Sequence, residues 1–254
     1  MSLTAGIDIG SITAKAAILR DGEILGTKVV FTGYNAEAAG RRVFEELLAE
    51  LGLVHPDIVR IVATGYGRRS VSIADKAVTE IMCHAAGARF LAPSVRSLID
   101  IGGQDSKAVV MDENGRVTNF TMNDKCAAGT GRFLEVMARA LEADLDEFGI
   151  LSLRAARPAK ISSLCTVFAE SEVISLIARG ETRENIIAGI HDAIASRVSA
   201  MANRIGLTAP VMMTGGVARN AGVVQSLEKV IGMPLVISPY AQVTGAIGAA
   251  VMTG

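Results

Sequence analysis

The feature that most constrains the fold is a repeat within the chain. The segments "IDIGSITAKAAILRDGEI" at 7–24 and "IDIGGQDSKAVVMDENGRV" at 99–117 carry the same residues at matching places. Each copy reads as an apolar strand, a glycine turn, a second apolar strand, a tight turn and a third strand, which predicts a β-meander. Two copies of one meander predict an α/β chain of two similar lobes, with the ligand in the cleft between them. The recurring residues are Ile7, Asp8, Ile9, Gly10, Lys15 and Ala16, which return as Ile99, Asp100, Ile101, Gly102, Lys107 and Ala108.

The rest of the chain alternates helical and strand-like segments around these meanders. Apolar residues at helical spacing follow the first meander, and a mostly helical stretch follows the second before strand-like segments return. No linker rich in Pro or Ser separates the lobes, so we place them at 1–95 and 96–254, with the last helix at 240–254 able to pack back onto the first lobe. The predicted helices are 35–52, 76–92, 129–142, 163–180, 182–206, 217–232 and 240–252, and the further strands are 58–67, 209–216 and 234–239.

Composition and charge exclude several classes of protein. The 254 residues are 50% hydrophobic and 20% charged with 26 glycines, which fits a compact α/β protein rather than a disordered one. The formal net charge is -1 and Lys and Arg form no block, so we expect no binding of nucleic acid or of a membrane surface through a basic patch. The N-terminus lacks a signal-peptide pattern and no apolar stretch has the length of a membrane span, which predicts a cytoplasmic protein without a disulfide framework.

The glycine turns of the two copies predict a nucleotide site. Small residues in "GSIT" at 10–13 and "GGQDS" at 102–106 let backbone N–H groups and hydroxyls approach phosphate oxygens closely. Asp8 and Asp100 stand at equivalent strand ends. Two carboxylates that face one cleft could hold Mg2+ through its waters, as Mg2+ is commonly held beside nucleotide phosphates.

Two further side chains and a third glycine turn complete the expected site. Lys15 would neutralise the transferring phosphoryl group, and Gln104 would orient the attacking water. The segment "MTGGVARN" at 213–220 leads from a strand into a helix and would suit the adenosine end. One glycine turn can equally be an ordinary strand end, but three in order favour a ligand site. The P-loop and Rossmann patterns are both absent from the sequence, so the alternative nucleotide folds lack their fingerprints.

Two of the three cysteines precede predicted helices. Cys126 lies in "MNDKCAAGTGRF" and Cys165 stands before "TVFAESEVISLIARG". The positive end of a helix dipole lowers a thiol pKa, so these thiolates would suit an anionic cluster, and a two-fold dimer would supply the four that a 4Fe-4S cluster needs. Spacing alone nevertheless favours the alternative that both are ordinary buried thiols. Cys83 and His84 lie in a predicted helix beside the small residues of "AAGA" and are interpreted as structural. A zinc site formed by Cys83, His84, Cys126 and Cys165 is a less favoured alternative, because adjacent residues of a helix point in different directions and the motif spacing is absent.

The three glycine turns resemble the two phosphate motifs and the adenosine motif of the actin, hexokinase and chaperone-ATPase superfamily. This resemblance covers nearly the whole chain and implies two duplicated actin-like lobes hinged about an ATP site. A closer resemblance is carried by the strings "IDIGGQDSK", "MNDKCAAGTGRFLEV", "CTVFAESEVIS", "IAGIH" and "MTGGVARN". They are similar to the activator component of 2-hydroxyacyl-CoA dehydratases, a family that includes the ATPase subunits of benzoyl-CoA reductase.

This closer resemblance implies an ATPase of anaerobic metabolism that binds ATP or ADP with Mg2+ and couples hydrolysis to electron transfer. It makes Cys126 and Cys165 the ligands of one 4Fe-4S cluster shared by a homodimer. The catalytic residues that it implies are Asp8, Lys15, Asp100 and Gln104. The residues that would contact the nucleotide are Gly10, Ser11, Ile12, Thr13, Ala14, Lys15, Gly102, Gly103, Gln104, Gly215, Gly216, Arg219, Asn220 and Gln242.

The resemblance also implies the partners. The chain would donate one electron at a time to a dehydratase or reductase component, which performs the chemistry on the acyl-CoA, and a ferredoxin or flavodoxin would be its own donor. ATP would close the lobes and rotate the helices behind the cysteines. Two alternatives remain open from the residues: a kinase for a small molecule or acyl group on the same scaffold, and a nucleotide-dependent redox sensor that only binds a partner.

Overall fold

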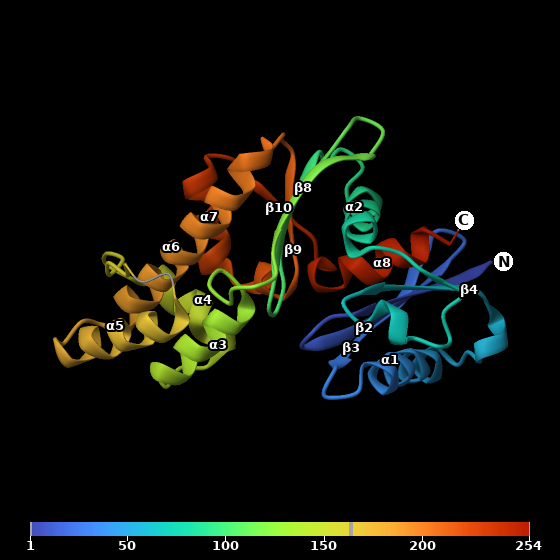
Figure 1. Ribbon diagram of the computed structural model, residues 1–254, viewed down its shortest axis with the longest axis horizontal. Coiled ribbons are helices and arrows are strands. Elements are labelled where there is room, and N and C mark those ends of the chain that lie inside the picture. The colour runs from blue at the N-terminus through green and yellow to red at the C-terminus, as the bar shows by residue number, and fades with distance from the viewer. Residues whose placement is uncertain (1, 163–164, 254) are drawn as a thin grey trace. The chain divides into compact units, whose positions relative to one another are not determined.

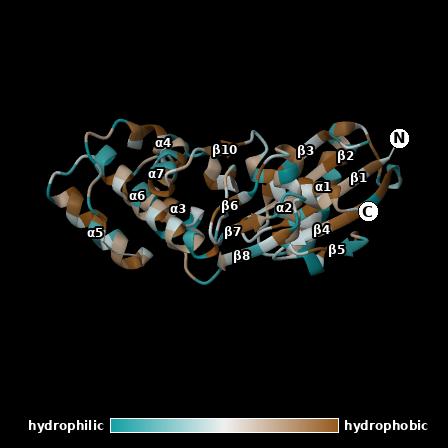
Figure 2. Ribbon diagram, turned by 90° about the horizontal axis from the view of Figure 1, so that it is seen from above, coloured by the Kyte–Doolittle hydropathy of each residue, from teal (hydrophilic) through white to brown (hydrophobic). Residues whose placement is uncertain are grey.

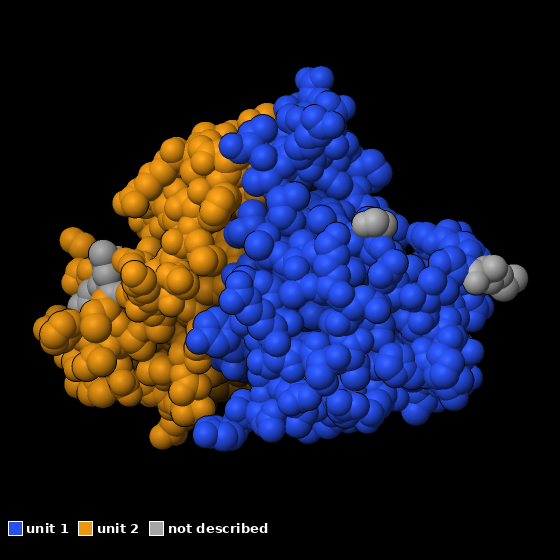
Figure 3. Space-filling model, turned by 45° about the vertical axis from the view of Figure 1, so that its right-hand side comes forward, with its two compact units in different colours: residues 1–96, 111–118, 238–254 blue, residues 97–110, 119–237 orange. Residues whose placement is uncertain are grey.

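The computed structural model describes residues 2–162 and 165–253, and the chain divides into two compact units. Unit 1 comprises residues 1–96, 111–118 and 238–254, and unit 2 comprises residues 97–110 and 119–237 (Figure 3). Each unit is built around a five-stranded sheet. Within the described residues, no helix is long and apolar enough to cross a membrane.

The sheet of unit 1 has the order β3-β2-β1-β4-β5. Its first three strands form an antiparallel meander, and β4 and β5 continue the sheet in parallel, so the first predicted meander is confirmed. Helix α1 lies on one side of this sheet, whereas α2 and α8 lie on the other (Figure 1). The elements are β1 Leu3–Ile9, β2 Thr13–Arg20, β3 Glu23–Phe31, α1 Ala36–Leu51, β4 Ile58–Gly65, β5 Lys76–Ala77, α2 Glu80–Leu91 and α8 Thr244–Val251.

Side chains alternate between the two faces of this sheet because successive residues of a strand point to opposite sides. Ile7 and Ile18 belong to the apolar cluster that contains Phe44 of α1. Ala17, one position from Ile18, belongs instead to the cluster that contains Ile247 of α8. Both faces of the central strands are therefore buried, which explains why these strands read as nearly continuous apolar runs.

Glycines allow α8 to lie directly against its neighbours. A Cβ atom on Gly6 of β1 would stand 1.9 Å from the carbonyl oxygen of Ala246. A Cβ atom on Gly248 would stand 1.7 Å from the carbonyl oxygen of Cys83 in α2. Contacts this short exclude any side chain, so the small residues of "TGAIGAAV" are required by backbone packing.

The sheet of unit 2 has the order β10-β9-β6-β7-β8. Strands β6 and β7 pair antiparallel and β8 follows β7 at the edge, which confirms the second predicted meander, while β9 and β10 add in parallel. The strands are β6 Ser97–Ile101, β7 Ser106–Met111, β8 Val117–Asn123, β9 Val211–Thr214 and β10 Leu235–Ile237. The helices are α3 Gly131–Ala140, α4 Leu145–Leu153, α5 Thr166–Ala178, α6 Arg183–Ala202 and α7 Ala221–Ile231.

Two helices of unit 2 differ in how they are packed. Helix α6 is buried along most of its length, as expected for the central helix of a cluster. Helix α5 buries only Ala169 and Val173, and several of its apolar residues are exposed, although Figure 2 colours much of its ribbon brown for hydrophobic residues. These exposed residues are Val167, Phe168, Ile174 and Ile177.

Several predicted helices begin later than their sequence patterns indicate. The segment at 76–92 first pairs as β5 and becomes helical only at Glu80. The segment at 217–232 starts as a 3-10 helix, Gly216–Arg219, and α7 begins after Asn220, whose side chain accepts a hydrogen bond from Val223 N and caps the helix. The predicted helix at 163–180 begins at Thr166, and its residues 163–164 lie outside the described part of the chain. Further 3-10 helices are His55–Asp57, Arg68–Ser70, Asn203–Ile205 and Ala241–Val243.

Candidate functional site

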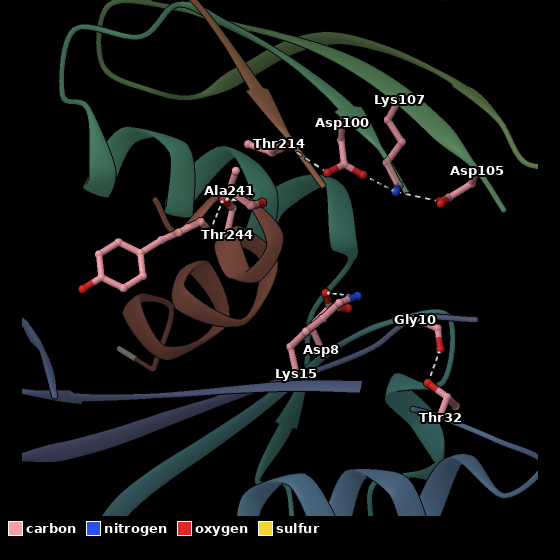
Figure 4. Close-up of polar contacts among 11 residues, drawn as sticks. Asp8, Gly10, Lys15, Thr32, Asp100, Asp105, Lys107, Thr214, Ala241 and Thr244 are labelled. Atoms are coloured by element: carbon pink, nitrogen blue, oxygen red, sulfur yellow. Dashed lines mark hydrogen bonds and ion pairs between the residues drawn. The ribbon is translucent and has the colours of Figure 1, made fainter. Parts of the chain in front are cut away.

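In unit 1, the first glycine turn lies beside a buried ion pair. Asp8 near the end of β1 is 4% exposed, and its Oδ2 atom is 3.3 Å from Nζ of Lys15 on β2, where the two residues are cross-strand neighbours (Figure 4). A buried carboxylate requires such a partner. A Cβ atom on Gly10 would stand 2.9 Å from the same Nζ, so the ammonium group lies over the turn. Thr32 Oγ1 holds the turn by donating to the Gly10 carbonyl at 2.8 Å.

The residues of unit 1 that are predicted to contact the nucleotide differ in how exposed they are. Ser11 at the tip of the turn is exposed, whereas Ile12 and Thr13 are half-buried and Ala14 is buried in β2. Gln242, predicted to lie near the adenosine, is half-buried in the 3-10 helix that leads into α8. The first turn therefore presents one hydroxyl to solvent next to a fixed positive charge, a combination that suits an anion.

In unit 2, the equivalent ion pair is enclosed by further partners. Asp100 is 2% exposed, and its Oδ2 atom is 3.0 Å from Nζ of Lys107 on β7. Thr214 Oγ1 on β9 donates to Oδ1 of Asp100 at 2.7 Å, and Lys107 also reaches Asp105 at 2.6 Å (Figure 4). Two carboxylates of unit 2 thus share one lysine ammonium group, and the Thr214 hydroxyl is a further partner of Asp100.

The second glycine turn is joined to helix α3 by its backbone. The N–H of Gly131 donates to the carbonyl of Gly102 at 2.9 Å, and the N–H of Arg132 donates to that of Gly103 at 2.8 Å. These are N–H groups of the first helical turn, which lack a partner inside the helix. Gln104, predicted to orient water, is exposed at the tip of the same turn. Two backbone hydrogen bonds therefore join the second turn to the start of α3.

The third glycine turn has a counterpart in unit 1 that the repeat in the sequence does not reveal. Gly215 has a φ of +87°, and a Cβ atom there would stand 2.2 Å from the carbonyl oxygen of Ile101. Gly65 has a φ of +84°, and its Cβ atom would stand 2.5 Å from the carbonyl oxygen of Ile9. Gly215 follows Thr214, which is paired with Asp100 on the neighbouring strand. Gly65 follows Thr64, which is paired with Asp8 in the same way. The duplication therefore includes, besides the three strands of each meander, a fourth strand in each sheet: β4 in unit 1 and β9 in unit 2.

The remaining predicted adenosine contacts lie directly after the third turn. Gly216 and Arg219 are exposed in the 3-10 helix, and Asn220 is half-buried at the start of α7. Asn220 is already engaged as the N-cap of that helix, with its Oδ1 atom 3.1 Å from Val223 N. Exposed glycine and arginine beside a fixed amide form a surface that a purine and ribose could contact.

The three cysteines occupy different environments. Cys83 is fully buried in α2, and burial raises the pKa of its thiol to about 11, which makes it unreactive. Cys126 is half-buried between β8 and α3, in a loop that Asn123 holds by donating to the Cys126 carbonyl at 2.8 Å. Cys165 is exposed as the N-cap of α5, and its side chain makes no capping hydrogen bond. The alternative that both are ordinary buried thiols is therefore wrong for Cys165, whereas Cys126 is partly buried.

Among the described residues, no group of three or more His, Cys, Asp or Glu side chains is placed to hold a metal ion. Cys126 and Cys165 supply soft sulfur donors, and both are accessible, which fits a cluster completed by a second molecule. Asp8 and Asp100 supply oxygen donors of the kind that Mg2+ prefers. Both carboxylates are engaged by lysines, a geometry that fits contact with Mg2+ through water.

Sequence reasoning missed several polar residues of the two ion-pair sites. Lys107 recurs in the repeat, but no pattern in the sequence indicates that it pairs with Asp105 as well as Asp100. Thr64 and Thr214 each stand in a "TG" dipeptide after an apolar strand, and this shared dipeptide is the signal that could have identified them.

Known proteins similar to this chain cover it from end to end. An activator of lactoyl-CoA dehydratase from Anaerotignum propionicum is 52% identical over 248 residues, which are 97% of this chain and 95% of that protein. A benzoyl-CoA reductase subunit from Thauera aromatica is 35% identical over 267 residues, covering 98% of this chain and 92% of that protein.

Solved structures show the same similarity in three dimensions. Component A of the (R)-2-hydroxyglutaryl-CoA dehydratase of Acidaminococcus fermentans is 48% identical with a TM-score of 0.96, covering 100% of this chain and 98% of that chain. The activator of the 2-hydroxyisocaproyl-CoA dehydratase of Clostridium difficile, solved with bound ADPNP, is 47% identical with a TM-score of 0.95, covering 99% and 94%. A ROK family glucokinase from Streptomyces griseus, 15% identical with a TM-score of 0.63 and coverage of 99% of both chains, shares the fold alone.

These similarities confirm the predicted fold class, an α/β chain with actin-like lobes, and the resemblance stated from the motifs. The sequence pattern of the BadF/BadG/BcrA/BcrD ATPase family matches residues 5–253. The chain is therefore an ATPase that belongs to the BadF/BadG/BcrA/BcrD family.

Proposed function

We propose that this ATPase is the activator of a 2-hydroxyacyl-CoA dehydratase or of a related acyl-CoA reductase, to which it delivers one electron at a time. The observation that carries the proposal is the backbone link between the second glycine turn and α3, the helix that follows Cys126. Through this link, a change at a bound nucleotide reaches the cysteine-bearing loop inside a single unit. The relatives named as dehydratase activators support the choice of partner.

The residues of unit 1 would hold the phosphate end of ATP. Ser11 and Thr13 offer hydroxyls at the first turn, and the Lys15 ammonium over Gly10 would neutralise charge on the transferring phosphoryl group. Asp8 would keep that ammonium in place and contact Mg2+ through water.

Residues of unit 2 are the further proposed contacts to the phosphates and to the adenosine. Backbone groups of Gly102 and Gly103 would line the phosphates, and exposed Gln104 would orient the attacking water. Asp100 is the proposed second contact to the waters of Mg2+. Contacts to the adenosine are proposed for Gly215, Gly216, Arg219, Asn220 and, from unit 1, Gln242.

Cys126 and Cys165 are the proposed ligands of a 4Fe-4S cluster, with the same two cysteines of a second subunit completing four thiolates. When bound, the cluster would supply a low-potential electron to the partner enzyme. Helix α5, which begins directly after Cys165, supports the homodimer because its exposed Val167, Phe168 and Ile174 form an apolar surface of the kind that a second subunit covers. A ferredoxin or flavodoxin is the proposed donor of the electron.

The metal content of anaerobically purified protein tests the cluster. We expect four iron and four sulfide per dimer for a 4Fe-4S cluster, loss of the cluster in Cys126→Ala and Cys165→Ala, and full retention in Cys83→Ala, since Cys83 is buried and inert. Alanine variants of Cys126 and Cys165 that keep full iron would exclude the cluster. A colourless wild-type protein that phosphorylates a small acceptor would instead favour the kinase.

The variant Gly131→Pro tests the link between the turn and α3. Proline fits the backbone at the first position of a helix, but its ring carbon replaces the hydrogen that Gly131 donates to Gly102, so the hydrogen bond is lost and the Gly102 carbonyl must move away from α3. We expect continued ATP hydrolysis but weaker ATP-dependent reduction of the partner, with Gly131→Ala as the control for the added Cβ atom. Equal electron delivery by the proline and alanine variants would show that this hydrogen bond does not couple the two events.

A further inference from the structure

The string "IAGIH" ends at a histidine that neither the glycine turns nor the cysteine loops explain. His191 lies in the middle of α6, is 0% exposed, and packs edge-on against Phe148 of α4. Its Nδ1 atom is 2.9 Å from Ser152 Oγ of α4. Its Nε2 atom is 3.4 Å from Nδ2 of Asn220, the residue that caps α7. One imidazole thus connects three helices, one of which begins at the proposed adenosine contacts.

The partners of Ser152, His191 and Asn220 determine which atom donates in each of these hydrogen bonds. Ser152 Oγ donates its only hydrogen to the carbonyl of Gly149 at 2.8 Å, so it accepts from His191 Nδ1. His191 therefore carries its proton on Nδ1, and Nε2 is left as an acceptor. Asn220 uses Oδ1 to accept from Val223 N, so its Nδ2 group donates to that acceptor. Each of these side-chain atoms is therefore the donor or the acceptor that its other hydrogen bond leaves possible.

Glycines make room for this arrangement. A Cβ atom on Gly222 of α7 would stand 2.0 Å from Ser152 Oγ and 2.5 Å from His191 Nδ1. A Cβ atom on Gly149 of α4 would stand 2.9 Å from Asn220 Oδ1. Burial lowers the pKa of His191 to about 3, so the imidazole stays neutral and retains its acceptor at physiological pH.

We propose that His191 is a positioning residue for the adenosine end of the nucleotide site, because its Nε2 atom fixes the orientation of the Asn220 amide. This inference rests on the proposed placement of adenosine beside Asn220. The positioning role requires only a hydrogen-bond acceptor at residue 191 for Nδ2 of Asn220. A merely structural role would require only a side chain that fills the buried space. The two requirements can be separated by substitution.

The test compares His191→Gln with His191→Asn in the full-length holoenzyme. Gln places an acceptor oxygen where Nε2 lies and so keeps the bond to Asn220, whereas Asn keeps only the donor to Ser152. We expect Asn to raise the KM for ATP about 5-fold, equivalent to about 1 kcal/mol, with kcat within about 2-fold of wild type. Gln should keep a KM close to that of wild type.

Ile194→Ala, one turn further along α6 and equally buried, is the control for lost stability. We expect it to lower the melting temperature without changing the KM for ATP. If the KM of all three variants follows their melting temperatures, or if the Asn variant binds ATP like wild type, the positioning role is overturned. The variant Asn220→Ala tests separately whether adenosine contacts Asn220. An unchanged KM for ATP in that variant would show that it does not, and the proposed activator function would not be affected.

A second measurement does not depend on any variant folding. In 15N NMR spectra of the wild-type protein, which has only three histidines, His191 should show a protonated Nδ1 and an unprotonated Nε2 from about pH 8 to about pH 5. The opposite tautomer, or protonation within this range, would overturn the inference directly.

Discussion

The two units carry the same aspartate and lysine on the same pair of strands, yet the surroundings of the two ion pairs differ. In unit 2, Lys107 is 3% exposed between Asp100 and Asp105, and Thr214 donates to Asp100. In unit 1, Lys15 is 14% exposed, and among the described residues Asp8 is the one carboxylate within ion-pair distance of it. The repeat supplies the same ion pair twice. In unit 2 a second carboxylate encloses the lysine, whereas in unit 1 the lysine is more exposed and is the cation proposed to meet the substrate anion.

The hydroxyls behind the aspartates show the same contrast. Thr214 Oγ1 donates to Asp100 at 2.7 Å. Thr64 Oγ1, at the equivalent position beside Asp8, has no partner at hydrogen-bond distance within the described residues, although burial, which raises the pKa of the Cys83 thiol, is partly opposed by the interaction of that thiol with Thr64. Both threonine side chains are fully buried, so the difference lies in hydrogen bonding rather than in access to water. The comparison yields a set of paired substitutions.

Lys107→Ala should produce the largest effect, on stability. It leaves Asp100 and Asp105 without their shared cation, and removal of one partner from a buried ion pair costs about 3–5 kcal/mol. Urea unfolding monitored by circular dichroism measures the free energy of unfolding. A loss below about 1 kcal/mol would show that the network is not what stabilises the second turn.

Lys15→Ala should act mainly on catalysis. Removal of one charged group that stabilises a transition state costs about 100-fold to 1,000-fold in rate. We expect such a loss in kcat for ATP hydrolysis, with a smaller loss of stability than in Lys107→Ala, because Lys15 is more exposed. Steady-state ATPase assays on Lys15→Ala and Lys107→Ala measure the kcat of each variant. Equal kcat values in wild type and Lys15→Ala would contradict the catalytic role of Lys15.

Thr214→Val and Thr64→Val form a matched pair of nearly isosteric changes. Loss of the hydrogen bond to the charged Asp100 should lower the free energy of unfolding by about 1.5–3 kcal/mol in the first variant. The second variant removes a buried hydroxyl that has no partner at hydrogen-bond distance, so its stability should be unchanged or higher. Both values come from the same unfolding experiment, and two equal losses would contradict the proposed asymmetry.

Acid should destabilise the helices of unit 2 through His191. The pKa of this group falls from 6.5 to about 3 on burial, so the unfolded chain binds a proton that the folded chain excludes. The contribution of His191 to stability is therefore complete above pH 6.5 and falls by up to about 1.4 kcal/mol for each pH unit between 6.5 and 3. Amide hydrogen exchange of α4, α6 and α7, with α1 as the reference, measures this pH dependence of stability. The His191→Gln variant should not show it.

The repeat was sufficient to predict the parts of the fold and site that depend on local pattern. Both meanders, and the positions of Asp8 and Asp100 near equivalent strand ends, follow from apolar alternation and glycine turns. The contact from Thr214 to Asp100 could not be predicted, because it depends on the parallel pairing of β6 with β9 across a long sequence separation. Pairing of distant strands is decided by packing of the whole sheet rather than by any short segment.

The cysteines show most clearly which properties follow from the sequence and which depend on the tertiary structure. The sequence by itself determined that Cys126 and Cys165 precede helices, that the chain repeats an aspartate, lysine and glycine motif, and that the family is one of ATPases. Only the tertiary structure decided that Cys83 of α2 is buried against β4 and α8 while Cys165 is exposed, and that Lys107 is enclosed while Lys15 is more exposed. Burial and charge balance depend on which distant segments pack together, and a local pattern carries no record of that.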